Sequence, residues 1–306
     1  MGIIVRCHKA LHRFLMYEAY YGLREKPFSI LPDPDLIYWG DTHRLAFAML
    51  EFGVMNNAGF TVITGEIGCG KTTLVRYLLR QLNRHIAVGL ISNTPQGKAG
   101  LLQWVMMSLN QPHEGSYSTL YMGLQRFLYE QYSKGRRTIL IVDEAQNLGL
   151  EGLEELRMLS NINADKDQFL QIILVGQPQL KDMLRTPQLL QFAQRVSSDF
   201  HLKPLVGNEV TQYINYRLKA VGSRFQLFSD DACKMIAAAS CGIPRTINIL
   251  CDTALVYGFA ASANQITPAL VTMVIENKQH YGVLPLAPIQ KDVEPVESIV
   301  IPWPAL

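Results

Sequence analysis

The chain has 306 residues, of which 48% are hydrophobic and 18% charged, and its formal net charge is +2. This length suits one large domain together with a smaller one, and the composition excludes a disordered or tail-like protein. The balanced charge neither requires nor excludes a nucleic-acid partner, because a local basic patch can exist within it.

The cysteines stand apart in the sequence and form neither a CxxC pair nor the Cys/His spacing of a zinc site. Such scattered thiols are typical of small buried side chains in a reducing compartment. They are Cys7, Cys69, Cys233, Cys241 and Cys251.

The N-terminus lacks the apolar core and cleavage site of a signal peptide, and no run of about 18 apolar residues occurs. We therefore expect no membrane span and a cytoplasmic location, with peripheral attachment to the inner membrane left open.

The first part of the chain contains two segments of different character. Residues 1–15 look like a detachable N-terminal extension. Beyond Tyr17, the prolines at 27, 32 and 34 exclude a continuous helix and indicate an extended segment laid over a domain surface. An amphipathic helix is expected from Thr42 to about Val54.

Residues 60–202 alternate short apolar runs with amphipathic helices, which is the pattern of βαβ units around a parallel sheet. A helix over Thr73–Asn83 follows the first strand, because its leucines repeat at helical spacing. The expected strands are Phe60–Thr64, Ile86–Ile91, Thr138–Val142, Leu170–Val175 and Asp199–Leu202.

After Pro204 the strand pattern stops, and residues 206–282 are expected to form a small all-helical domain. Ser229 is placed to cap one helix, and Thr267 puts a capping hydroxyl before Pro268 at a first helical position. From Gly282 the sequence becomes rich in proline and is expected to be a flexible end, with a short docking peptide as the alternative. The expected divisions are an extension over 1–15, an α/β domain over 16–204, a helical domain over 205–282 and a tail over 283–306.

The segment Gly65–Thr72 matches GxxxxGK[ST] in full, between an expected strand and an expected helix. Glycines there let backbone N–H groups turn toward phosphate oxygens, and the helix N-terminus favours the anion. Lys71 would reach the β- and γ-phosphates, and the Thr72 hydroxyl would bind Mg²⁺. The alternative is a glycine-rich turn that binds no nucleotide. The residues expected around the phosphates are Gly65, Glu66, Ile67, Gly68, Cys69, Gly70, Lys71, Thr72 and Thr73.

Cys69 is interpreted as a variable position of this loop. Its place beside a helix N-terminus could lower the pKa of its thiol, which would make it sensitive to oxidation.

A second motif is the apolar run Thr138–Val142, which ends in Asp143 and Glu144. Two carboxylates at a strand end are expected where Mg²⁺ and an attacking water meet beside a P-loop. Asp143 would orient the metal, and Glu144 would act as general base toward the water. This pair favours hydrolysis over nucleotide binding alone, and the sequence contains no guanine-reading Asn-Lys-x-Asp segment.

Three further side chains are candidates for contact with the γ-phosphate. Gln177 follows a predicted strand and could position phosphate or water, although it could also be a turn residue before proline. Arg195, just before the last strand, is a candidate arginine finger acting on a neighbouring subunit, with a solvated side chain as the alternative. Arg245 begins a helix of the helical domain and could bend back onto the nucleotide, or it could be an exposed helix-terminal arginine.

Together with these motifs, Pro27-Phe28, Pro32-Asp33-Pro34, His43, Gly176-Gln177-Pro178 and Gly242-x-Pro-Arg-x-Ile-Asn resemble the AAA+ ATPases of the ExeA, or general secretion pathway protein A, type. The likeness covers about residues 16–282. It implies an α/β fold, with a three-layer P-loop AAA+ domain built on a parallel sheet and followed by a helical lid. It also implies ATP and Mg²⁺ as ligands and a homo-oligomer, ring or filament, in which Arg195 faces the next subunit's site.

Two functions remain open from the sequence. Relatives of the ExeA type serve secretin assembly, pilus biogenesis and exopolysaccharide export, which implies a protein partner in such a machine. Secretion members commonly continue into a membrane span and a peptidoglycan-binding domain, neither of which follows within these residues. ATPases of the TniB type share the core and load onto DNA, so an adaptor ATPase of a transposition system is the alternative. The modest basic clusters are more typical of solvated faces than of a DNA track, so nucleic acid is not the favoured partner.

Overall fold

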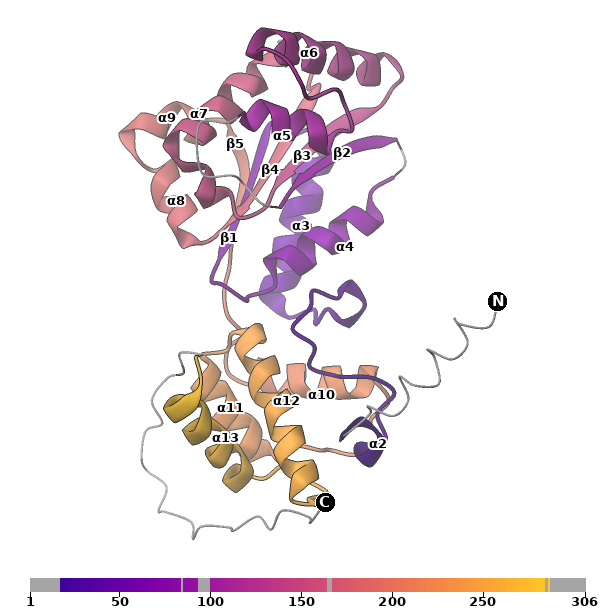
Figure 1. Ribbon diagram of the computed structural model, residues 1–306, viewed down its shortest axis with the longest axis vertical. Helices are drawn as coiled ribbons and strands as arrows, with labels where there is room; N and C mark the ends of the chain where they lie inside the picture. The colour runs from indigo at the N-terminus through magenta and orange to yellow at the C-terminus, as the bar shows by residue number, and fades with distance from the viewer. Residues whose placement is uncertain (1–16, 84, 93–99, 164–166, 284–285, 287–306) are drawn as a thin grey trace, which may run out of the picture. The chain divides into compact units, whose positions relative to one another are not determined.

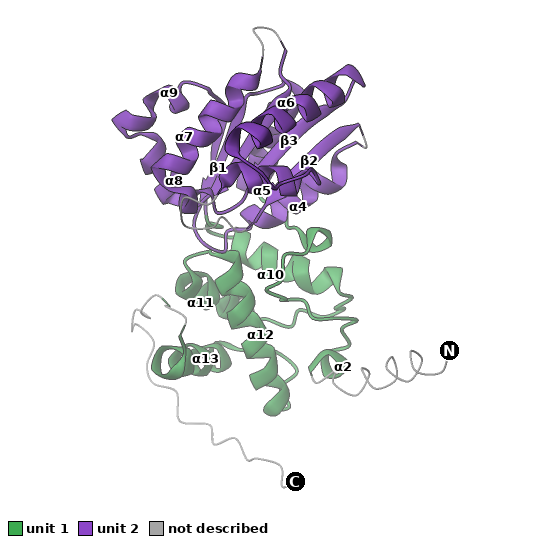
Figure 2. Cartoon of the chain, turned by 45° about the horizontal axis from the view of Figure 1, so that its top comes forward, with its two compact units in different colours: residues 1–40, 204–306 green, residues 41–203 purple. Residues whose placement is uncertain are grey.

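The computed structural model describes residues 17–83, 85–92, 100–163, 167–283 and 286 (Figure 1). The chain divides into two compact units (Figure 2). Unit 1 combines the residues up to Gly40 with those from Pro204 onward, and unit 2 is the continuous stretch Asp41–Lys203. The extension expected over 1–15, and all of the expected tail except residues 283 and 286, lie outside the described residues.

A parallel sheet of five strands forms the centre of unit 2, with the order β2-β3-β4-β1-β5. The middle strands β3 and β4 are nearly continuous apolar runs buried along their length, as expected for a parallel sheet covered on both faces. The predicted parallel sheet is confirmed. Its strands are β1 (Phe60–Gly65), β2 (Ile86–Ile91), β3 (Arg137–Val142), β4 (Leu170–Gly176) and β5 (Val196–Leu202).

Helices cover both faces of this sheet and complete a three-layer α/β unit (Figure 1). On one face lie α3 (Asp41–Met55) and α4 (Lys71–Gln81). On the other face, one apolar cluster joins Phe60, Leu140 and Leu170 of the strands to the remaining helices. These are α5 (Leu101–Ser108), α6 (Tyr117–Ser133), α7 (Gly149–Leu159), α8 (Pro178–Leu184) and α9 (Leu190–Ala193), with 3-10 turns η2 (Ala145–Leu148), η3 (Ser160–Ile162) and η4 (Pro187–Leu189).

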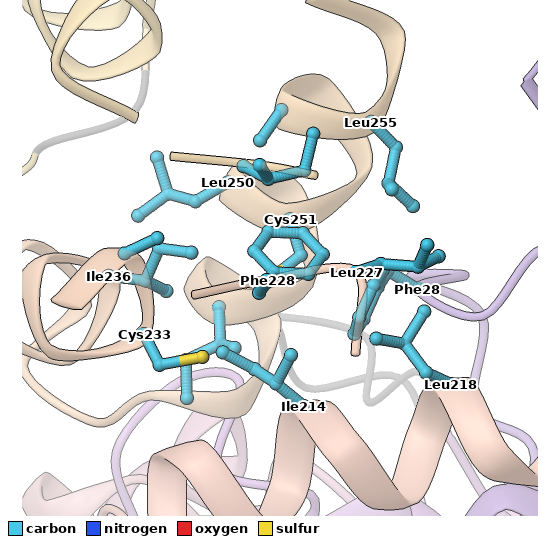
Figure 3. Packing of buried hydrophobic residues seen from close by; sticks show 14 of the residues in the cluster. Phe28, Ile214, Leu218, Leu227, Phe228, Cys233, Ile236, Leu250, Cys251 and Leu255 are labelled. Carbon is cyan, nitrogen blue, oxygen red and sulfur yellow. The ribbon is translucent and has the colours of Figure 1, made fainter. Parts of the chain in front are cut away.

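Unit 1 is helical and has its own core. Phe28 packs edge-on against Phe228, with ring centroids 6.0 Å apart, among aliphatic side chains of the helices (Figure 3). The predicted helical C-terminal part is therefore confirmed. Its elements are α2 (Tyr17–Tyr21), η1 (Pro34–Leu36), α10 (Glu209–Ala220), α11 (Asp230–Ser240), α12 (Pro244–Ala260) and α13 (Pro268–Tyr281).

The segment 17–40 belongs to unit 1, which corrects the boundary that placed it in the α/β domain. Arg217 of α10 is buried and donates hydrogen bonds to the carbonyl oxygens of Pro27 (2.6 Å) and Leu36 (3.3 Å). The Tyr17 hydroxyl hydrogen-bonds to Asp252 of α12. Because a buried guanidinium must be satisfied by acceptors, Arg217 fixes this proline-rich segment to the helices.

The helix starts predicted in unit 1 are correct in position but not all in chemistry. The Ser229 hydroxyl accepts a hydrogen bond from the backbone N–H of Ala232 at the start of α11, as predicted. Pro268 is the first residue of α13, but the Thr267 hydroxyl makes no capping bond. None of the helices in the described part of the chain combines the length and apolar character that a membrane crossing needs.

Candidate active site

The loop Gly65–Thr72 runs from the end of β1 into the first turn of α4. Gly68 and Gly70 have φ angles of +86° and +99°, which side chains with a Cβ rarely adopt. Gly70 is the N-cap of α4 and offers no capping side chain, so the first N–H groups of the helix face the loop. This backbone forms the kind of concave N–H cradle that binds phosphate.

Lys71 places its ammonium group inside this loop. Its side chain is 5% exposed, and Nζ donates to the carbonyl oxygens of Gly65 (2.8 Å) and Glu66 (3.0 Å). Burial lowers the pKa of Lys71, and the nearby Glu144 and Asp143 carboxylates oppose that shift. The side chain is thus a buried cation held by carbonyl dipoles at the mouth of the loop.

Thr72 and Asp143 meet although one lies in the first turn of α4 and the other follows β3. The Thr72 hydroxyl donates to Asp143 Oδ2 at 2.8 Å, and Asp143 is the residue after β3. Burial raises the pKa of Asp143, while the hydrogen bonds from Thr72 and from the Glu144 backbone oppose the rise. The structure therefore brings together the two residues that were predicted to bind metal.

A hydroxyl and a carboxylate oxygen in contact fit Mg²⁺ in particular. This ion takes one or two protein oxygens and keeps water or phosphate oxygens as its other ligands. Within the described ranges, no group of three or more His, Cys, Asp or Glu side chains could hold a metal ion by itself. The residues present thus suit an ion that enters with a phosphate ligand.

Glu144 follows Asp143 in an unusual backbone conformation. Its φ is +52°, a left-handed value that is uncommon for a residue with a side chain, and its N–H donates to Asp143 Oδ1 (3.0 Å). Burial acts to raise the pKa of Glu144, but hydrogen bonds from Gln146 and Gln177, with Lys71 nearby, outweigh it and lower the pKa. Hydrogen bonds from both glutamines thus hold the carboxylate in place.

Gln177 lies at the end of β4, the strand between β1 and β3. Its side-chain amide donates to Glu144 Oε2 at 3.0 Å. The strand order explains the contact, because the residue that follows β4 lies between the strand end that leads into the P-loop and the strand end that leads into the carboxylate pair. Of the predicted residues, Lys71, Thr72, Asp143, Glu144 and Gln177 are thus gathered at one edge of the sheet.

Two residues of this cluster were not predicted as site residues. Gln146 hydrogen-bonds both to Glu144 and to Gln177. His43 of α3 is buried, and its Nε2 lies 3.0 Å from the carbonyl oxygen of Cys69, so it contacts the P-loop backbone. His43 was recognised only as part of the family resemblance, and nothing in the spacing of the sequence marks Gln146 as a contact of Glu144.

The expectation of a lowered thiol pKa at Cys69 is wrong. Its side chain is buried, and burial raises the pKa of the thiol to about 11. The neighbouring Lys71 opposes that rise but does not overcome it. Of the other cysteines, Cys233 and Cys251 are buried as expected, Cys241 is exposed, and Cys7 lies outside the described residues.

The remaining P-loop positions differ in exposure. Ile67 has an exposed fraction of 58%, and Thr73 is half-buried in the first turn of α4. Glu66 contributes the carbonyl oxygen that accepts from Lys71.

Arg195 lies at the opposite edge of the sheet. It precedes β5, whose first residue, Val196, pairs with Phe60 at the start of β1. Its three hydrogen bonds all come from Nη1, to Asn161 Oδ1 (2.7 Å), Ser160 Oγ (2.8 Å) and the carbonyl oxygen of Arg157 (3.2 Å). The side chain is exposed and does not join the cluster at the P-loop.

Arg245 belongs to unit 1, where it is the second residue of α12 and is exposed. Its contact with nucleotide stays a prediction.

Residues 54–184 match the AAA domain family. The chain is also similar to General secretion pathway protein A from Aeromonas hydrophila, with 38% identity over 253 residues. That match covers 82% of this chain and 46% of the relative, so the chain spans about half the length of that protein.

Solved structures with the same fold share little sequence with this chain. The Aeropyrum pernix ORC1 protein in complex with DNA gives a TM-score of 0.61 at 16% identity, over 83% of this chain and 69% of that one. The Aeropyrum pernix ORC2 protein in its ADPNP–ADP complexes gives 0.59 at 16% identity, over 81% and 68%. Drosophila ORC bound to DNA gives 0.59 at 18% identity, over 82% and 64%. At these identities the likeness shows the fold alone.

Proposed function

The chain carries an AAA domain and resembles General secretion pathway protein A over 82% of its length, and on this premise we propose that it is a Mg²⁺-dependent ATPase. We propose further that ATP turnover drives or switches the assembly of an envelope secretion, pilus or exopolysaccharide export system.

One observation carries the enzymatic proposal. The Thr72 hydroxyl hydrogen-bonds to Asp143 at 2.8 Å beside the buried Lys71 ammonium. The pair that we propose to bind metal and the cation that we propose to bind phosphate thus belong to one cluster, with the Glu144 carboxylate next to Asp143 in the chain. A glycine-rich turn without nucleotide would not need a buried lysine, because burying a charge is costly unless an opposite charge pairs with it, and the hydrogen-bond acceptors of Lys71 are neutral carbonyl oxygens.

Different residues of this chain bind the phosphates, bind the metal and accept the proton during hydrolysis. The backbone of Gly65–Thr72 and the Lys71 ammonium hold the phosphates, and Thr72 and Asp143 would hold Mg²⁺. When bound, Mg²⁺ stabilises the charge of the phosphate oxygens during phosphoryl transfer. Glu144 accepts a proton from the attacking water, whose oxygen bonds to the γ-phosphorus as the bond to ADP breaks.

Arg195 completes this site from a second copy of the chain. β1 has six residues, so the P-loop lies roughly 20 Å along the strands from the start of β5. This distance is beyond the reach of one arginine side chain. An exposed arginine at the far edge can act on nucleotide in a neighbouring subunit, which supports a homo-oligomer as the active form.

The enzymatic proposal is tested by phosphate release from ATP by the purified full chain. We expect release in the presence of Mg²⁺, loss of release when EDTA removes the metal, and a higher melting temperature with Mg-ATP than without it. Neither release nor a melting shift under conditions where the chain is folded would contradict the proposal.

The role in export is tested by identifying what the chain binds in its own cells. A Glu144→Gln variant should retain ATP and hold its partner for longer. Components of a secretin, pilus or polysaccharide machine should co-purify with it. Recovery of a transposase instead, in an ATP-dependent manner, would overturn the export role and leave the ATPase assignment in place.

A further inference from the structure

Glu144 and Gln177 are joined by a third side chain, Gln146, which lies in the turn η2 directly after the carboxylate pair. We propose that Gln146 is a positioning residue for ATP hydrolysis, because its amide fixes which oxygen of Glu144 receives the proton from the attacking water. This inference rests on the proposed ATPase function and concerns a residue to which neither the motifs nor the comparisons give a role.

The amide of Gln146 uses both of its ends. Its Nε2 donates to Glu144 Oε2 at 2.7 Å, and its Oε1 accepts the backbone N–H of Gln177 at 3.0 Å. The side chain of Gln177 then donates to the same Glu144 Oε2 at 3.0 Å. These hydrogen bonds form a closed circuit, so no member can turn without breaking a bond to another.

The local backbone is shaped to allow this circuit. The left-handed φ of Glu144 turns the chain after β3, and the buried Ala145 anchors η2, so that Gln146 points back over the strand ends. A Cβ on Gly176 would lie 2.8 Å from Gln146 Oε1, closer than a real Cβ approaches an oxygen. Glycine at 176 is therefore what lets the Gln146 amide reach the end of β4.

The two amides leave the oxygens of Glu144 unequal. Both donate to Oε2, whereas no side chain or backbone group among the described residues hydrogen-bonds to Oε1. An oxygen that already accepts two hydrogen bonds has little capacity for a third proton donor. The attacking water therefore gives its proton to Glu144 Oε1. The water oxygen forms the bond to the γ-phosphorus as the bond to ADP breaks.

If Gln146 positions Glu144, a substitution of Gln146 should lower the rate of turnover and leave ATP binding unchanged. Among the described residues neither amide hydrogen-bonds to the P-loop, so a Gln146 variant should bind ATP normally. In such a variant only Gln177 would still hold the Glu144 carboxylate, so the base would be less well positioned, and misplacement of a reacting group costs up to about 10²-fold in rate. The loss should be smaller than the loss in a Glu144 variant, because the carboxylate itself remains.

The test compares Gln146→Met, which keeps the size but loses the amide, with Asn147→Met as the matched control. Asn147 is the next residue and is exposed. We expect Gln146→Met to lower kcat by about 10- to 100-fold with the affinity for ATP and the melting temperature unchanged. Asn147→Met should match the wild type. Gln146→Glu gives a second variant, because it retains the acceptor for the Gln177 N–H but has no donor for Glu144, and its kcat should fall as well.

A double-substitution cycle separates positioning from a structural role. If Gln146 acts through Glu144, then Gln146→Met should cause no further loss in a Glu144→Gln background. Multiplicative losses, or a full kcat in Gln146→Glu or Gln146→Met, would overturn the inference. Absence of hydrolysis in the wild type would instead refute the proposed function, so the two failures can be told apart.

Discussion

The two edges of the parallel sheet in unit 2 carry very different chemistry. At the carboxyl edge, Lys71, Thr72, Asp143 and Glu144 are buried or half-buried, and hydrogen bonds join Thr72 to Asp143 and Asp143 to Glu144. At the amino edge, Arg195 is exposed and bonds to two neutral side-chain oxygens and one carbonyl oxygen.

The carboxyl edge thus holds the residues that we propose to bind nucleotide, while the amino edge presents a cation outward. The buried groups at the carboxyl edge already have hydrogen-bond partners within the chain. An exposed arginine held through one of its nitrogens keeps its other donors for a partner. We therefore interpret the two edges as the two halves of one catalytic site that forms between copies of the chain.

The largest effect is expected from Lys71→Ala at the carboxyl edge. The substitution removes the P-loop's side-chain cation, so nucleotide binding should be lost. Mg-ATP at a hundredfold excess over Kd stabilises a binding protein by about 2.7 kcal/mol. A melting scan should therefore show a shift in the wild type and in the surface control Lys134→Ala, but none in Lys71→Ala. Equal shifts in all three would rule out the P-loop as the binding site.

Arg195→Ala should come next. It should bind ATP like the wild type but lower kcat by about 10³-fold or more, the usual contribution of an arginine finger. Steady-state hydrolysis at saturating ATP measures the loss, and Arg185→Ala, another exposed arginine of unit 2, is the control. A normal kcat in Arg195→Ala would show that the amino edge has no catalytic role and is an ordinary solvated surface.

Glu144→Gln should lower turnover by about 10²–10⁴-fold while ATP stays bound. The carboxamide has nearly the same shape but cannot accept a proton. Single-turnover hydrolysis and the melting shift with Mg-ATP distinguish loss of chemistry from loss of binding, and the exposed Glu151→Gln serves as control. Near-normal turnover would mean that the base lies elsewhere.

The smallest effect should follow from Asn161→Ala. The Asn161 Oδ1 accepts a hydrogen bond from Arg195 Nη1 at 2.7 Å on the surface. Such a bond contributes roughly 0.5–1.5 kcal/mol to the stability of the bonded arrangement. If Arg195 must be pre-oriented to act, kcat should fall by about 2- to 10-fold with ATP affinity unchanged. A fall as large as that of Arg195→Ala would show that Asn161 has a role of its own.

The sheet could be predicted from the sequence because each strand is a short apolar run between helical patterns. The predicted and observed bounds of β2 are identical, and those of β1, β3 and β4 differ by one residue. β5 begins at Val196 instead of Asp199, because Ser197 and Ser198 interrupt the apolar pattern on this edge strand. An edge strand is exposed on part of its length, so hydrophobicity alone underestimates it.

The site could be predicted only where a motif fixes the spacing. The P-loop and the Asp143–Glu144 pair follow from their positions after strands. The contact of Gln146 with Glu144 and Gln177 depends on β4 lying between β1 and β3. Strand order cannot be predicted from a local sequence pattern. The unit that segment 17–40 joins was mispredicted for a similar reason, since the buried Arg217 that binds it lies far away in the sequence.

The most direct test of the account mixes two inactive variants. Glu144→Gln subunits retain the arginine, and Arg195→Ala subunits retain the base, so a mixed oligomer contains interfaces with both. We predict that the mixture recovers part of the ATPase activity that each variant lacks alone, and that the specific activity of the wild type rises with protein concentration. No recovery despite demonstrated co-assembly, or full activity in a wild type that stays monomeric at every concentration, would contradict a catalytic site shared between copies.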